Sequence, residues 1–222
     1  MNTIKTFINN RFKILSIVFV LMSTSLFLLM LRVKLTQSFF YLFLVWNLFL
    51  AIIPYAISII MVHKNISNKL QLFLGFGVWL AFLPNAPYII TDLWHLRLAS
   101  SDIFWLDIIV VSSFAANGLL LFYLSLHDML QLLNQYLQKV FFKVLPIILI
   151  LLSSFGIYLG RFLRYNSWEI LSNPKVLFTD TLLIFIKPSE YSEAWLFILI
   201  FSLFLYIGYW AFRSLFSTTI NQ

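Results

Sequence analysis

The stretch "LQLFLGFGVWLAFLPNAPYIITDLWHL", residues 70–96, determines how the rest of the chain must be arranged. Its first part, from Leu70 to Leu83, is apolar and as an α-helix would extend about 21 Å. This length falls short of the roughly 30 Å hydrocarbon core of a bilayer. To complete a crossing, the chain must carry Pro84 and Pro87 into the membrane, and each proline removes a backbone N–H donor. The stretch therefore predicts a transmembrane helix that is broken at membrane depth.

The composition of the whole chain indicates an integral membrane protein. Of its 222 residues, 62% are hydrophobic and only 10% are charged, whereas a soluble domain has about 25% charged residues. There is no cysteine, which excludes disulfides, thiolate nucleophiles and cysteine metal sites. The net charge of +7 is best explained by lysines and arginines that lie beside anionic headgroups, because no nucleic-acid-binding module is evident.

The apolar segments predict an all-α fold, a polytopic transmembrane helix bundle in a single membrane domain over residues 1–222. A spanning helix needs about 20 residues, and six segments reach or approach this length: 14–31, 39–62, 70–91, 103–126, 140–160 and 194–213. The first is expected to be a retained helix, because no small-residue cleavage site precedes Arg32. A shorter piece, 176–186, lies between Pro174 and Pro188 and predicts an interfacial or re-entrant helix.

Charged residues predict the orientation of the chain in the membrane. Eight lysines and arginines fall on the side of the amino terminus and seven on the other side. The first helix has three cations before it and two after it, which predicts that both termini are cytoplasmic. All acidic residues except Asp128 fall on the opposite, outer side. Ionisable chemistry is therefore expected at the outer face.

The proline-containing stretch predicts a specific backbone path. A proline disfavours helical geometry in the residue before it, which predicts non-helical backbone at Leu83 and Ala86. Asn85 is suited to cap a helix that restarts there, with Pro87 in its first turn.

A restarted helix would bring together the first candidate site residues. Tyr88, Asp92 and His95 are spaced i, i+4 and i+7, which places them on one helical face. In a functional interpretation, Asp92 tunes His95 as an acid, a base or a ligand. In a structural alternative, these polar groups satisfy loose backbone at a kinked helix end and face lipid headgroups.

Two further polar groups are candidates for the same outer site. Asp107 lies more than a turn inside the fourth apolar segment, where a carboxylate is costly unless it is paired or hydrated. Arg161 and Arg164 lie one turn apart and would suit a clamp for phosphate or carboxylate. Alternatively, these arginines reach lipid phosphates or neutralise acidic side chains such as Glu169. Deeper in the fourth segment, Asn117 is expected to form a hydrogen bond between helices.

Two of these motifs together resemble a known family. "FLPNAPYIITDLWHL" (82–96), an acidic start to the next helix, and "GIYLGRFLRYNSWE" (156–169) resemble the bacterial DUF1361 family of predicted multi-pass membrane proteins of unknown function. The resemblance extends from about residue 40 to 213. Glu169 closes the second motif where an aspartate is more frequent in the family. The resemblance implies a bacterial cytoplasmic membrane protein, and it implies no established activity, substrate or catalytic residue.

These features together predict an outward-facing site that binds or processes a lipid or another anionic substrate. The candidate catalytic residues are Asp92, His95 and Asp107, and the candidate substrate-binding residues are Asn85, Tyr88, Arg161, Arg164 and Glu169. The sequence leaves open whether any reaction takes place, and it names no cofactor. No metal is expected, because no dense histidine motif accompanies the acidic residues.

Two other functions stay open at this point. A transporter or permeation component would be lined by the broken helix and Asp107. A nonenzymatic assembly partner, or a helix-mediated oligomer, would dock through Gly156 and Gly160, whose spacing allows two helices to approach closely.

Overall fold

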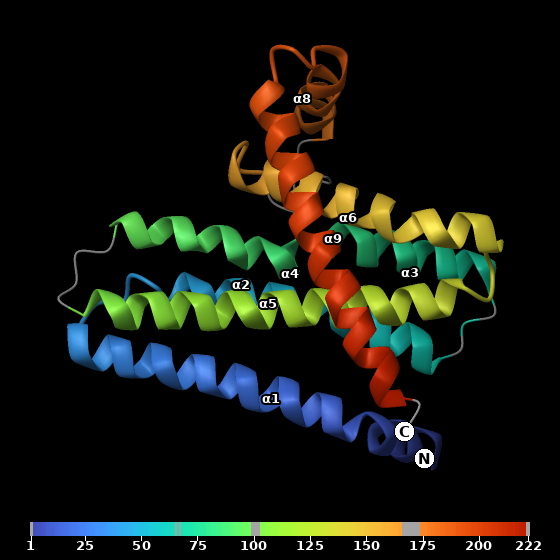
Figure 1. Cartoon of the computed structure of the whole chain (residues 1–222), viewed down its shortest axis with the longest axis horizontal. Helices are drawn as coiled ribbons and strands as arrows, with labels where there is room; N and C mark the ends of the chain where they lie inside the picture. Colours follow the sequence, from blue (N-terminus) through green and yellow to red (C-terminus); the bar gives the residue numbers. More distant parts are fainter. Residues whose placement is uncertain (1, 65, 67, 99–102, 166–173, 221–222) are drawn as a thin grey trace. The chain divides into compact units, whose positions relative to one another are not determined.

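The structure of the 222-residue chain is a computed structural model that describes residues 2–64, 66, 68–98, 103–165 and 174–220 (Figure 1). Every regular element within these residues is helical. Six helices are long and apolar enough to cross a membrane: Arg11–Thr36, Phe43–His63, Lys69–Arg97, Phe104–Leu133, Phe141–Arg161 and Ser192–Leu215. The predicted all-α transmembrane fold and its six spans are therefore confirmed.

The chain divides into two compact units, each with its own set of helices. The first unit, Met1–Leu132, contains α1 (Asn2–Thr36), α2 (Phe43–His63), α3 (Lys69–Phe82), α4 (Asn85–Tyr88), the 3-10 helix η1 (Ile89–Leu98) and nearly all of α5 (Phe104–Leu133). The second unit, Leu133–Gln222, contains α6 (Lys139–Arg161), α8 (Pro174–Ile186) and α9 (Ser192–Ile220).

Helix α5 joins the other helices of the first unit through polar contacts. The indole Nε1 of Trp79 in α3 donates to the Ser125 hydroxyl at 2.8 Å. The Asn117 amide donates to the hydroxyl of Ser25 in α1, also at 2.8 Å, so the predicted interhelical hydrogen bond is confirmed. In Figure 1, α1 and α5 run side by side in opposite directions. Such hydrogen bonds hold helices together where lipid offers no competing partner.

The third span is interrupted at the two prolines, as predicted. Asn68 caps α3 by accepting a hydrogen bond from the Leu70 N–H at 2.9 Å, and α3 then continues to Phe82. The single turn of α4 follows, and the chain continues as the ten-residue 3-10 helix η1. A 3-10 helix has about three residues per turn. The spacing of side chains along η1 therefore differs from that expected for a restarted α-helix.

The predicted backbone at the break is wrong in two respects. Leu83 keeps right-handed helical geometry (φ −54°, ψ −41°), and Ala86 lies within α4. Pro84 occupies the N-cap position in place of Asn85, and no side chain caps α4. The physical reason is that the Ala86 N–H donates to the Leu83 carbonyl at 3.3 Å, in a tight i to i+3 turn. In a continuous α-helix the Leu83 carbonyl would accept a hydrogen bond from residue 87, but Pro87 has no N–H to donate. The turn gives the Leu83 carbonyl another donor.

The break is packed within the protein. Leu83, Ala86 and Ile89 are fully buried. A Cβ atom placed on Gly118 of α5 would lie only 2.3 Å from the Ala86 carbonyl oxygen, so only glycine allows the approach of α5 to this turn. Irregular backbone at membrane depth is tolerated where protein covers it, and the small residue in α5 provides that cover.

In the second unit, α6 packs against α9, and α8 contacts both through aromatic side chains. The rings of Phe155 in α6 and Phe185 in α8 are 5.5 Å apart, and Phe185 contacts Trp195 of α9 edge-on at 5.3 Å. The Trp195 indole donates to the Ile184 carbonyl at 3.1 Å. The short helix predicted at 176–186 is present as α8, whose 13 residues are too few to cross a bilayer.

Candidate functional site

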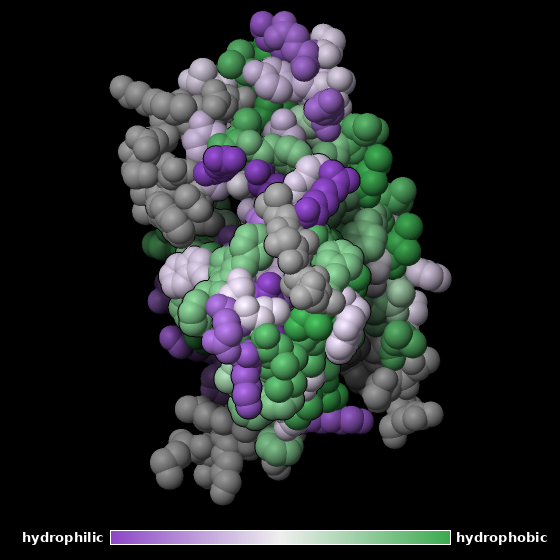
Figure 2. All heavy atoms as spheres, turned by 90° about the vertical axis from the view of Figure 1, so that its left-hand side faces the viewer, coloured by the Kyte–Doolittle hydropathy of each residue, from purple (hydrophilic) through white to green (hydrophobic). Residues whose placement is uncertain are grey.

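Three candidate residues of the first unit, Asp92, His95 and Asp107, lie toward the end where α1 finishes and α5 begins. Figure 2 shows hydrophilic side chains among hydrophobic ones on the side that includes this end. Asp92 and His95 both belong to η1, in which residues three apart are aligned. This geometry aligns Asp92 with His95, whereas Tyr88, in the preceding α4 turn, is offset from Asp92 by about a third of a turn. Of the three residues predicted to share one helical face, only Asp92 and His95 are therefore aligned.

Asp92 and His95 form a close pair with contrasting exposure. The Asp92 side chain is 1% exposed and its Oδ1 lies 3.6 Å from Nδ1 of His95, whose side chain is 26% exposed. The same Nδ1 lies 3.3 Å from the Asp92 carbonyl oxygen. Both oxygens are acceptors when the carboxylate is ionised, so a proton on Nδ1 of His95 would face two acceptors of Asp92.

Asn47 of α2 holds the other side of the Asp92 carboxylate. Its Nδ2 donates to Oδ2 of Asp92 at 2.7 Å. The ring of Phe43, one turn earlier in α2, lies 4.7 Å from the His95 ring. Asn47 was not among the residues predicted from the sequence, although a lone amide in the predicted 39–62 span indicates a buried polar partner. Asn85 and Tyr88 are half-buried in the neighbouring α4 turn.

Asp107 has a different partner from those expected. Nε of Arg32 in α1 lies 2.9 Å from its Oδ1, and both side chains are almost fully buried. The Arg32 guanidinium also donates to the Ser38 carbonyl at 2.8 Å and lies 4.7 Å from the centre of the Tyr41 ring. From the sequence, Arg32 was predicted only to flank the first helix. Its role in neutralising Asp107 depends on a contact across 75 residues of chain.

Tyr41 has an unusual environment in this cluster. Its side chain is fully buried, and its hydroxyl has no hydrogen-bond partner within the part of the chain that the structure describes. Burial raises the pKa of Tyr41 to about 12, and the negative charge of Asp107 adds to this effect, while the positive charge of Arg32 opposes it. The phenol is therefore neutral throughout the physiological range.

An aromatic segment joins the two polar centres. The ring of Tyr41, beside Arg32, lies 5.0 Å from that of Phe40 and 6.2 Å from that of Phe43. Phe40 and Phe43 in turn contact His95. These rings therefore connect the Asp107–Arg32 pair with the Asp92–His95 pair.

The arginine pair lies in the second unit. Arg161 is the last residue of α6 and is half-buried. Arg164 is exposed and has left-handed backbone (φ 62°), so the expected spacing of one helical turn between the two arginines is wrong. The helix ends because the chain turns at this point, where the Tyr165 N–H donates to the Leu159 carbonyl at 3.1 Å. Glu169 lies outside the described residues.

The acidic and histidine side chains do not assemble into a metal-ligand set within the described ranges. No three of them come close enough together to hold an ion. The chemistry that the first unit offers is therefore that of a buried carboxylate beside an imidazole, and of a buried carboxylate beside a guanidinium.

Comparison with known proteins yields a single family. No curated protein and no solved structure matches the chain. The family described as "Protein of unknown function (DUF1361)" matches residues 46–207. This range covers more than half of the 222 residues and includes the proline break, Asn47, Asp92, His95 and both arginines of the second unit. The chain, an integral membrane protein with six apolar helices, belongs to the DUF1361 family.

Proposed function

We propose that the chain uses its Asp92–His95 centre, on the outer side of the membrane, to bind and process an anionic lipid or another anionic molecule. The observation that carries the proposal is the contrast within the pair, because Asp92 is 1% exposed while the His95 side chain is 26% exposed. A buried carboxylate that orients a partly exposed imidazole is an arrangement used in general acid–base catalysis. The Asn47 hydrogen bond at 2.7 Å supports it by keeping the carboxylate in place.

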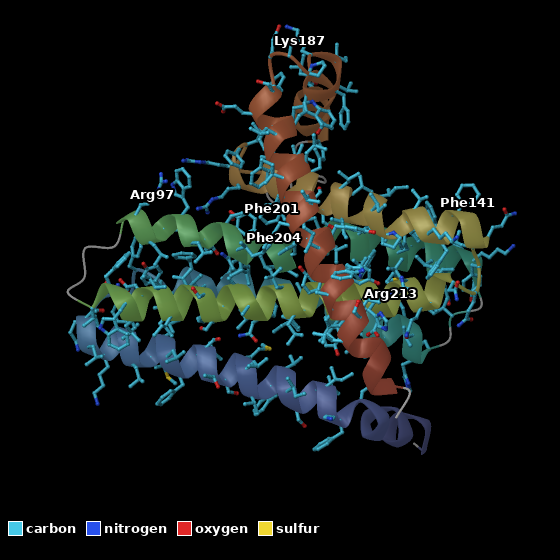
Figure 3. All side chains as sticks on the ribbon, in the orientation of Figure 1. Arg97, Phe141, Lys187, Phe201, Phe204 and Arg213 are labelled. Atoms are coloured by element: carbon cyan, nitrogen blue, oxygen red, sulfur yellow. The ribbon has the colours of Figure 1, made fainter. Side chains whose placement is uncertain are left out.

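Cationic side chains would supply the affinity for the anionic part of the substrate. Arg97, two residues after His95, is exposed, and its guanidinium lies 4.2 Å from the centre of the Trp94 ring (Figure 3). A planar guanidinium suits phosphate and carboxylate groups, and an exposed tryptophan suits the membrane interface. In the second unit, Arg161 and Arg164 are proposed as further residues that bind an anionic group.

The other candidates have supporting roles in the proposal. Asn85, Tyr88 and Glu169 contact the remaining polar groups of the substrate. Asp107, with the Arg32 guanidinium 2.9 Å away, contributes through its charge.

The contacts of the broken helix favour this proposal over permeation. The Ala86 carbonyl packs closely against Gly118, and Asp107 is engaged by Arg32. A transport path would need these groups to face a hydrated passage. A substrate that approaches His95 from the outer face needs no change in either contact.

Lipid retention by the purified full-length protein tests the binding step. Native mass spectrometry would compare phosphatidylglycerol with phosphatidylcholine, which differ in headgroup charge. We expect the wild type to retain phosphatidylglycerol preferentially, and the double variant R161Q/R164Q to lose this preference. The control is Lys187→Gln, which removes an exposed cation that is 3.0 Å from Glu190. A wild type without a preference for the anionic lipid would refute the binding step.

The chemical step is tested in nanodiscs that contain isotopically labelled phosphatidylglycerol. Lipid products would be followed by mass spectrometry, with equal amounts of folded protein. We expect D92N and H95Q to abolish product formation while leaving lipid retention in place. The control is H63Q, which changes a histidine at the end of α2. Equal turnover in H95Q and the wild type would exclude His95 from the reaction.

A further inference from the structure

Helices α1 and α5 are joined by an ion pair near each end of α1. Arg32 pairs with Asp107 at 2.9 Å. Arg11 pairs with Asp128 through both of its terminal nitrogens, and its Nη2 lies 2.8 Å from Oδ1. In both pairs the arginine comes from α1 and the aspartate from α5. The Arg11–Asp128 contact is two-pronged, and such contacts are among the strongest between charged side chains.

The spacing of the pairs matches the thickness of a membrane. The two arginines are 21 residues apart in α1, and the two aspartates are 21 residues apart in α5. At about 1.5 Å per residue, each spacing corresponds to about 31 Å along the helix axis. The hydrocarbon core of a bilayer is about 30 Å thick. The two ion pairs are therefore spaced to lie at the two boundaries of the hydrocarbon region.

A third polar contact between the ends has the same register. Asn117 donates to the Ser25 hydroxyl at 2.8 Å and to the Leu21 carbonyl at 3.3 Å. Asn117 follows Asp107 by ten residues, and Leu21 precedes Arg32 by eleven, as an antiparallel helix pair in one register requires. The three contacts agree on how far α1 is inserted against α5.

The two helices differ in their relation to the family. The matched range, 46–207, contains all of α5 but none of α1. Asp107 and Asp128 are both buried, so the family-matched part of the chain contains two carboxylates whose arginine partners come from outside it. A buried carboxylate that loses its partner is strongly destabilising, and more so in the membrane.

We infer that the face of α5 formed by Asp107, Asn117 and Asp128 is a recognition surface for a transmembrane helix with two arginines 21 residues apart, and that α1 is its partner. The ion pairs select α1 and set its depth in the bilayer. Asn117 sets its rotation. This inference is independent of the proposed function, because it involves neither Asp92 nor His95.

Cysteine cross-linking in the full-length protein tests the register, since the chain has no cysteine of its own. S25C/N117C places two thiols at side chains whose polar atoms are 2.8 Å apart. The matched control is T24C/N117C, because Thr24 is the exposed neighbour of Ser25. After mild oxidation in membranes, unfolded protein would be treated with a maleimide polymer that adds mass to each free thiol. We expect S25C/N117C to lose both additions and the control to keep both. Equal cross-linking of the two pairs, or none in S25C/N117C, would overturn the register.

Charge exchange tests whether the ion pairs select α1. R32D places two carboxylates together, and the exchanged variant R32D/D107R restores opposite charges with α1 and α5 reversed. We expect R32D to reduce the S25C/N117C cross-link severalfold and the exchanged variant to recover it. If R32D leaves the cross-link unchanged, the ion pair does not select α1. If R32D/D107R cross-links no better than R32D, the pairing is not electrostatic and the inference is equally overturned.

Discussion

Arg32 and Asp107 form a buried ion pair, 2.9 Å between Nε and Oδ1, that joins the end of α1 to the beginning of α5. Asp107 stood out in the sequence as a costly carboxylate in an apolar segment. Its partner shows how that cost is met. Asp92 likewise accepts a hydrogen bond from Asn47, so each of these carboxylates has a polar neighbour from another helix.

The free energy of unfolding is expected to fall further when one partner of the Arg32–Asp107 pair is lost than when both are replaced. Arg32→Gln removes the counter-charge that lies 2.9 Å from the buried Asp107 carboxylate and should lower the free energy of unfolding by about 3–5 kcal/mol. R32M/D107L replaces both charges by apolar side chains and should be less destabilised than R32Q. Unfolding in mixed detergent micelles measures both, with the exposed Lys34→Gln as control. A double variant that is less stable than R32Q would contradict this explanation.

Asn47 is expected to control the hydrogen bonding of His95 through Asp92. Asn47→Leu removes a donor to Asp92 Oδ2 and with it one restraint on the orientation of the carboxylate beside Nδ1. The neutral imidazole should then lose part of its preference for a proton on Nδ1. Nitrogen NMR of protein with labelled histidine distinguishes the two tautomers. The signals of His63 and His127 are internal controls and should not change; an unchanged His95 signal would show that Asn47 does not act through Asp92.

Gly118 is expected to tolerate no side chain, in contrast to Gly77. A Cβ on Gly118 would meet the Ala86 carbonyl oxygen at 2.3 Å, and neither backbone can give way cheaply. Gly118→Ala should therefore lower the free energy of unfolding by about 1–3 kcal/mol. A Cβ on Gly77 meets nothing within 4 Å, so Gly77→Ala should stabilise α3 by about 1 kcal/mol. Thermal unfolding of the two variants would refute the packing argument if both changed in the same direction.

Tyr41 is expected to make stability depend on pH in the alkaline range. Its pKa is raised from 10.0 to about 12 in the folded protein, so the folded state keeps a proton that the unfolded chain loses. The contribution of Tyr41 to stability is therefore fully present below about pH 10 and is lost as the pH rises through about 12. Tyr41→Phe cannot titrate, and it should lose less stability than the wild type across this window.

Unfolding of the wild type, Tyr41→Phe and Tyr136→Phe at alkaline pH checks this dependence. The control, Tyr136→Phe, removes an exposed tyrosine from the α5–α6 connection and should follow the wild type. The difference in tyrosinate absorbance between wild type and Tyr41→Phe should show a group that titrates above the usual tyrosine range. A difference spectrum that titrates near 10 would mean that Tyr41 is not shielded as described.

The predicted orientation is tested by labelling intact cells with a membrane-impermeant maleimide. Gln37→Cys in the α1–α2 connection and Ser189→Cys in the α8–α9 connection should both react, because both positions are exposed and belong to the predicted outer side. Gln135→Cys, in the α5–α6 connection, should be protected until the cells are opened. Labelling of Gln135→Cys alone would mean that the site faces the cytoplasm.

Much of the fold was predictable because it depends on local composition. An apolar run of about 20 residues must cross the bilayer as a helix wherever it occurs in the chain. The six spans and the short helix α8 follow from this rule, and the prolines at 84 and 87 mark the break by removing backbone donors. The backbone at the break was not predictable in detail, since a close contact with Gly118 stabilises a compact turn there.

The sequence by itself determined where the membrane spans lie and that Asp107 is a carboxylate within one of them, whereas only the tertiary structure decided which polar groups meet. Arg32 and Asp107 are 75 residues apart, Asn47 and Asp92 are 45 apart, and Arg11 and Asp128 are 117 apart. Hydrophobicity acts on each segment separately and can be summed along the chain. A hydrogen bond or ion pair requires two particular helix faces to meet within about 3 Å, and that depends on how the helices pack.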